Sequence, residues 1–166
     1  MREGAIRHFE GITIDATQWP LILWDSAPLR VSDRAFADAM GWVEELTQTT
    51  PRGEKSFMLT DLSRLEEAAP PSQRKYAADF MNRNRDLIQR VSAGAGIVAK
   101  SAIVRGGITA VFWIRPPPVE TRVVATREEG LLYGIGMLEK ACPPLPPHLV
   151  ALRAKLTSAR PAASRN

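Results

Sequence analysis

The sequence predicts an α/β protein, with a mixed β-sheet of about five strands and helices packed against it. Two observations lead to this fold class. Short apolar runs of strand length recur along the chain, and segments with apolar residues at helical spacing separate most of them. The length of 166 residues supports one domain with a substantial core and is too short for two ordinary domains.

The first predicted elements form a hairpin and a helix. Apolar residues alternate from Ile12 to Ile14, a turn covers 18–20, and an apolar run follows at 21–24, so we expect two strands around a turn. Ser32 is a suitable N-cap for a helix whose apolar residues continue at helical spacing to Leu46.

A second strand–helix pair follows. The stretch "KSFMLTDLS" at 55–63 is typical of a buried strand whose carboxyl end reaches the surface. Pro70, Pro71 and Ser72 then predict the start of a helix with an apolar stripe that continues to Val91. We expect Ser72 to be the N-cap of this helix, because its side-chain oxygen can accept a backbone N–H that the helix leaves unpaired.

The next elements are a strand at 95–101 and a segment at 102–114 that could be a short helix or another strand. We favour the helix. Prolines at 116–118 end this segment, and "VETRVVAT" at 119–126 is the last predicted strand. Thr126 and Glu129 then match a capping box, which predicts a helix that continues to about Leu138.

The positive charge is confined to the end of the chain. The formal net charge is +4, and residues 143–166 contain four basic and no acidic residues, so residues 1–142 are neutral. We therefore divide the chain into a domain at 1–142 and a Pro-rich basic tail at 143–166, in which 149–156 could form a short helix. A neutral domain without a basic cluster argues against nucleic-acid binding.

Compartment and membrane association follow from cysteine content and hydropathy. Cys142 is the only cysteine, so an internal disulfide is excluded and a reducing, cytoplasmic location is expected. The longest apolar run, at 106–114, is far shorter than the ~20 residues that span a bilayer. We expect no export signal and no stable membrane insertion.

The stretch "GAGIVAKS" at 94–101 comes within one residue of a phosphate-binding loop. Such a loop follows a strand and opens a helix, whereas here a predicted helix precedes the glycines and Ile97–Ala99 would themselves be the strand. Ala99 also replaces the last glycine, where a Cβ would crowd a ligand held by the backbone. We expect a buried strand and no nucleotide cofactor.

The residues that catalysis or metal binding would require are few. His8 and His148 lie near the two ends of the chain, and neither has a second His, a Cys or a carboxylate at metal-ligand spacing. The adjacent pairs Glu66–Glu67 and Glu128–Glu129 are typical of solvated surface charge. No catalytic residue, metal site or cofactor is predicted.

The stretch "LTDLSRLEEAAPPSQRKY" resembles the STAS family of anti-sigma-factor-antagonist type, in particular its divergent single-domain bacterial members. Asp61-Leu62-Ser63 matches the D-L-S that ends a central strand in that family, and "IVRGGITAVFWIRPP" is similar to a segment of its divergent members. Ser72 lies close to the position of the regulatory Ser or Thr, although Pro-Pro-Ser-Gln replaces the family's D-S-[ST]-G turn.

The resemblance implies a non-enzymatic bacterial regulatory or scaffolding protein that binds a partner protein around the start of its second helix. The partner-binding residues would be Ser63, Ser72, Gln73, Arg74 and Lys75, with Ser72 as a possible phosphorylation site. A homodimer is possible. The alternatives are a module that binds a small apolar ligand or lipid, which a deep apolar pocket would favour, and an enzyme, which converging ionisable groups in a cleft would favour.

Overall fold

The computed structural model describes residues 5–159 and has the predicted α/β architecture. Its six-stranded sheet has the spatial order β1-β2-β3-β4-β5-β6. β1, β2 and β3 are antiparallel neighbours, whereas β3, β4, β5 and β6 run parallel. The strands are β1 (Ile6–Phe9), β2 (Ile12–Asp15), β3 (Leu21–Ser26), β4 (Ser56–Asp61), β5 (Ser92–Val98) and β6 (Thr121–Val124).

The sheet has one strand more than the sequence predicts, because β1 at the edge was missed. Ile6, Arg7 and His8 are all exposed, so this strand lacks the apolar alternation that marks a half-buried strand. It pairs with β2 across a tight turn at Gly11, whose φ of 72° is left-handed. The predicted hairpin of β2 and β3 is confirmed.

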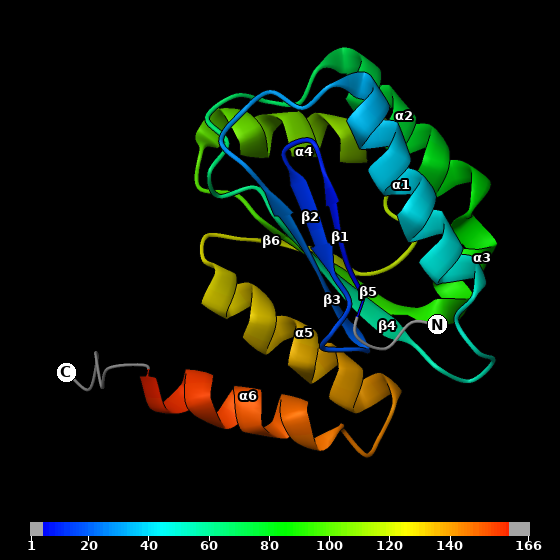
Figure 1. Ribbon diagram of the computed structural model, residues 1–166, viewed down its shortest axis with the longest axis vertical. Coiled ribbons are helices and arrows are strands. Elements are labelled where there is room, and N and C mark those ends of the chain that lie inside the picture. The colour runs from blue at the N-terminus through cyan, green and yellow to red at the C-terminus, as the bar shows by residue number, and fades with distance from the viewer. Residues whose placement is uncertain (1–4, 160–166) are drawn as a thin grey trace.

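Helices cover both faces of the sheet (Figure 1). α1, α2 and α3 lie on one face, and α5 lies on the other with α6 packed outside it. The helices are α1 (Asp33–Gln48), α2 (Pro71–Arg83), α3 (Arg85–Val91), α4 (Ala102–Ile114), α5 (Arg127–Ala141) and α6 (Pro147–Ala159). The helical interpretation of 102–114 is therefore confirmed.

Two apolar cores lie on opposite faces of the sheet. Under α1 and α2 the core includes Ile14, Trp24 and Phe80. Under α5 it includes Phe57 and Leu59 of β4, which point away from the first core. Because β4 contributes to the second core through alternate residues, its pattern matches a central strand.

An N-cap residue was predicted for three helices, and the structure confirms two of these predictions. The Ser32 hydroxyl accepts the N–H of Ala35 at 3.2 Å, as predicted for the start of α1. The Thr126 hydroxyl accepts the N–H of Glu129 at 3.2 Å, which confirms the predicted helix start. The Glu129 carboxylate in turn accepts the N–H of Ala125.

The segment expected to be one helix up to Val91 is divided into α2 and α3 at Asn84. The Asn84 side chain donates to the carbonyl of Phe80 at 3.3 Å and to Glu44 of α1 at 3.1 Å. These bonds to a preceding turn and to a distant helix favour an interruption at this residue.

"GAGIVAKS" lies mostly in β5, so the buried-strand interpretation is confirmed. The strand ends at Val98, and its glycines therefore lie within the strand, before the connection to α4. A Cβ added to Gly96 would come within 2.8 Å of Leu59 Cδ1, so the glycine serves close packing between β5 and β4.

The predicted helix in the basic tail is α6, and Leu149 in its first turn is buried. Leu149 has no exposed surface and belongs to the core under α5. Arg153 forms an ion pair with Glu139 of α5 at 2.6 Å. Leu152 and Leu156 of α6 also pack against this core, so α6 is attached to the domain by several apolar contacts and an ion pair.

Candidate binding surface at the carboxyl edge of the sheet

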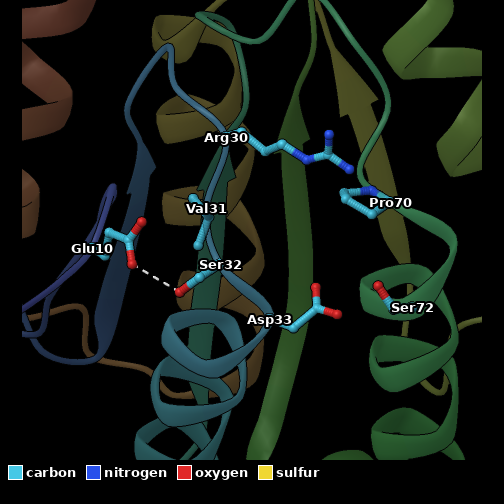
Figure 2. Close-up of a pocket in the computed structure, with 7 residues that line it drawn as sticks. All are labelled: Glu10, Arg30, Val31, Ser32, Asp33, Pro70 and Ser72. Carbon is cyan, nitrogen blue, oxygen red and sulfur yellow. Dashed lines mark hydrogen bonds between the residues drawn. The ribbon is translucent and has the colours of Figure 1, made fainter.

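An open hollow of about 290 Å³ lies between the β1–β2 turn and the first turns of α1 and α2. Since α1 and α2 follow β3 and β4, the hollow is at the carboxyl edge of the parallel strands, where α/β folds place ligands. Figure 2 shows Asp33 and Ser72 on opposite sides of it, with Arg30 extending toward Pro70. The lining residues are Glu10, Arg30, Val31, Ser32, Asp33, Pro70 and Ser72.

Polar contacts hold the walls of this hollow in place. The Ser32 hydroxyl donates to Glu10 Oε2 at 2.8 Å, which joins the β1–β2 turn to the start of α1. Gln73 Nε2 donates to the carbonyl of Val31 at 2.9 Å and to Asp33 Oδ1 at 3.0 Å, which joins the starts of α1 and α2. The spacing of the two helix starts is therefore set by side chains from distant parts of the sequence.

Gln73 was predicted to contact a partner, but only 5% of its surface is exposed. Its side-chain amide already donates hydrogen bonds to Val31 and Asp33 inside the protein. These bonds offset the cost of burying the amide. Gln73 can thus shape the surface without itself facing a partner. The sequence could not indicate this, since its acceptors lie some 40 residues earlier in the chain.

The prediction that Ser72 is an N-cap is wrong. α2 begins at Pro71, Pro70 occupies the N-cap position, and no side-chain bond caps the helix. Proline suits the first helical position because its fixed φ is helical and its missing N–H would be unpaired there anyway. Ser72 consequently lies inside the first turn, where it is exposed and lines the hollow.

The other predicted partner-binding residues lie away from the hollow's lining. The half-buried Ser63 donates its N–H to Asp61 Oδ1 at 2.9 Å. Lys75 is exposed and forms an ion pair with Asp79 at 2.6 Å. Arg74 is half-buried, and its Nε has no hydrogen-bond partner among residues 5–159. Of the five predicted residues, the structure brings only Ser72 to the hollow.

A charged cluster that the sequence analysis missed joins the ends of β3 and β4 to α5. Arg127, in the first turn of α5, donates to Asp61 Oδ2 at 3.1 Å and to Asp25 Oδ2 at 3.3 Å, and also pairs with Asp25 Oδ1. Asp25 and Asp61 are paired neighbours in the parallel register. Each aspartate ends an apolar run, and that shared pattern was the available signal.

The cluster keeps Asp61 ionised. Burial by itself would raise the pKa of Asp61, but hydrogen bonds from Ser63 and Arg127, together with the charge of Arg127, lower it below its ordinary value. Asp61 thus remains a carboxylate at neutral pH and is poorly suited to act as a general acid. The cluster joins the ends of β3 and β4 to the start of α5 and so holds the sheet and this helix together.

We expect Arg127→Met to lower the free energy of unfolding by about 1–2 kcal/mol at neutral pH, since it removes charged hydrogen bonds that are partly exposed to water. The depressed pKa of Asp61 contributes stability above its ordinary pKa of 3.8, and this contribution is lost as the pH falls through the lower folded value. The deficit of the variant should therefore shrink in acid, as urea unfolding followed against pH would show.

Arg64→Met is the matched control, because Arg64 is exposed in the loop after β4. It should change stability by less than about 0.5 kcal/mol at any pH. A deficit of Arg127→Met that stayed constant from neutral pH to strong acid would mean that Arg127 stabilises the fold by packing alone.

A second hollow, of about 240 Å³, lies between β6 and α5. Its Tyr133 hydroxyl donates to Glu120 Oε1 at 2.9 Å, and the Arg122 guanidinium lies 5.5 Å from the Tyr133 ring centre. Burial and the bond to Glu120 raise the pKa of Tyr133 to about 12. The phenol is thus a poor general base, and its hydroxyl is already paired within the protein.

Comparison with known proteins assigns this chain to no family. No family model, curated protein or solved structure matches the chain. Between residues 5 and 159, no cluster of three or more His, Cys, Asp or Glu side chains could hold a metal ion. None of the helices in that range is long and apolar enough to cross a membrane.

Proposed function

We propose that this chain is a non-enzymatic regulatory or scaffolding module of the bacterial cytoplasm that binds a partner protein around the start of α2. One observation carries the proposal: Ser72 remains exposed at the rim of a hollow whose two helical walls are tied together by the buried Gln73. A pre-positioned surface loses little conformational freedom on binding, which favours affinity.

The resemblance of "LTDLSRLEEAAPPSQRKY" to STAS proteins of the anti-sigma-factor-antagonist type supports the same surface. In that family, partners dock where a central strand leads to the second helix. Here Asp61 at the end of β4 makes a turn with the Ser63 N–H and pairs with Arg127. The D-L-S sequence is thus explained by local structure, and we propose that it supports the docking surface from below.

Phosphorylation of Ser72 is part of this proposal. A phosphate at the first turn of α2 would lie near the positive end of the helix dipole, with Arg74 and the exposed Lys75 on the same turn. Across the hollow it would approach the Asp33 carboxylate. Such a modification would therefore change the charge of the partner-binding surface. It would not disrupt an N-cap, because the Ser72 side chain does not cap α2.

Binding of a small apolar ligand is the less favoured function. Ligand pockets are usually enclosed, mostly apolar and at least about 300 Å³. The hollow at the helix starts is open, and its lining includes two carboxylates, a guanidinium and two hydroxyls. This composition suits polar contacts to a protein surface better than it suits an apolar molecule.

The test is capture of a partner by the immobilised full chain, followed by calorimetric affinities of that partner for single variants. We expect Ser72→Asp to weaken or strengthen binding at least several-fold, because about one added charge lies within the contact. Its stability should change by less than about 1 kcal/mol, since an acid in the first helical turn is tolerated. Ser72→Ala should leave stability unchanged within about 0.5 kcal/mol, as Ser72 caps nothing.

Ser158→Asp is the matched control, because Ser158 is exposed on α6, which lies on the other side of the sheet from α2 (Figure 1). It should leave partner affinity unchanged. Wild-type affinity for Ser72→Asp, or an equal effect of Ser158→Asp, would show that the partner docks elsewhere.

A further inference from the structure

α4 presents an apolar face to solvent. Ile103, Trp113 and Ile114 are 67%, 84% and 74% exposed, which makes them the most exposed large apolar residues between positions 5 and 159. Ile103 and Ile114 are about three helical turns apart and lie on the same side of the helix, with Ala110 between them. Trp113 extends this face at the end of the helix.

α4 packs on the protein through the side that carries Val104 and through Gly107, which lies between Ile103 and Ile114. Val104 is 3% exposed, and a Cβ added to Gly107 would come within 2.9 Å of Ala68 Cβ, so the helix backbone lies close to the loop after β4. Ser101 at its N-cap donates to the carbonyl of Glu66 at 3.2 Å. α4 is therefore apolar around most of its circumference, and the rest of the fold covers only part of it. A helix that is apolar all round is normally buried on all sides.

Most of the exposed charges within and next to α4 are basic, and the acidic exceptions are Glu66 and Glu67 in the loop that packs against it. Lys100, Arg105 and Arg115 are exposed before, within and after α4. The sequence contains no acidic residue between Asp86 and Glu120. Of the carboxylates on the neighbouring α2, Asp79 is paired with Lys75 at 2.6 Å. The surface that covers α4 should therefore be apolar in depth and negatively charged at its boundary.

We propose that α4 is an interfacial helix that docks the protein reversibly on an anionic membrane surface. Ile103, Trp113 and Ile114 enter the boundary between headgroups and acyl chains, while Lys100 and Arg115 at the two ends of the helix lie among anionic headgroups. Arg105 instead donates to the carbonyls of Ala99 and Lys100. Tryptophan at the end of the helix suits this depth, because its ring is apolar and its N–H is polar. A second copy of the chain fits less well, since two α4 faces would bring like charges together.

This inference concerns a different surface from the one around Ser72 and does not depend on the proposed partner protein. It also agrees with the length of α4, which has 13 residues and lies along a bilayer without crossing it. Binding through one short helix and a few cations is weak and salt-sensitive, as expected for reversible docking.

The experiment measures flotation of the full chain with vesicles of phosphatidylcholine, alone or with about one-third phosphatidylserine. We expect binding to the anionic vesicles that falls at high salt, with little binding to phosphatidylcholine alone. The double variant Ile103→Ser with Ile114→Ser should bind at least tenfold more weakly, because it places hydroxyls where apolar side chains would be buried. Lys100→Ala with Arg115→Ala should also weaken binding.

Val150→Ser is the control, since Val150 is 43% exposed on α6 and carries an apolar side chain away from α4. It should bind like wild type, and thermal unfolding should show that every variant remains folded. Absence of binding to anionic vesicles, or equal binding by the double serine variant, would overturn the proposal. Sedimentation of a dimer that the double serine variant converts to monomer would overturn it in favour of a second copy of the chain.

Discussion

Leu149→Ala should lower the free energy of unfolding by about 2–5 kcal/mol, the usual cost of truncating a fully buried leucine. Leu149 lies in the first turn of α6 and has no exposed surface. It belongs to the same core as Phe57 of β4 and Leu138 of α5, so its truncation leaves a cavity in that core. Chemical denaturation of the full chain would measure the loss.

Val150→Ala is the matched control on the same helix, since this side chain is 43% exposed. It should change stability by less than about 0.5 kcal/mol. The division of the chain at residue 142 implies that truncation after Cys142 leaves a folded domain. The burial of Leu149 leads us to expect that this domain is less stable than the full chain by at least the cost of Leu149→Ala. If Leu149→Ala and the truncation both left stability unchanged, residues 143–166 would be an appendage.

Gly134→Ala should destabilise the protein, although alanine is normally the better helix former. A Cβ at Gly134 would come within 2.6 Å of two atoms of the Phe57 ring, which is fully buried. Overpacking of this kind costs about 1–3 kcal/mol. Thermal and urea unfolding of the variant would measure the effect.

For Gly136→Ala, two residues further along α5, we expect the opposite effect on stability. A Cβ there would meet nothing within 4 Å. The variant should therefore gain up to about 1 kcal/mol from helix propensity. Equal effects of the two substitutions would mean that α5 does not approach β4 as closely as the structure has it.

The close approach of α5 also positions the charged cluster. Gly130, like Gly134, lies against β4, where a Cβ would come within 2.5 Å of Leu59 Cδ1. Arg127 is in the first turn of the same helix and reaches Asp25 and Asp61 on the strands below. Packing on one face of the sheet thus determines a polar contact at its edge.

Much of the fold could be predicted from local sequence. Ser32 and Thr126 mark helix starts through the chemistry of their own side chains. The apolar alternation from Ile12 to Ile14 and the run at 21–24 indicate a hairpin. A helix precedes "GAGIVAKS", so this stretch lacks the strand that a phosphate-binding loop follows, and its own apolar residues indicate a strand. These signals act over a few residues, so one sequence is enough to detect them.

Local sequence was misleading where two signals competed or where none was present. At the start of α2, the preference of Ser72 for a cap competed with Pro71, whose fixed φ moved the helix start toward the N-terminus. β1 has no buried side to impose alternation on its sequence. Both outcomes depend on neighbours that the sequence does not show.

By itself, the sequence determined the fold class, most of the elements and their order, since periodicity and capping are properties of adjacent residues. Only the tertiary structure decided which residues meet: Gln73 with Asp33, Arg127 with Asp25, and Leu149 with the core under α5. It alone also decided that α4 leaves an apolar face exposed. The physical reason is that apolar periodicity indicates that a face is buried, whereas the segment that buries it lies far away in the chain and cannot be identified from adjacent residues.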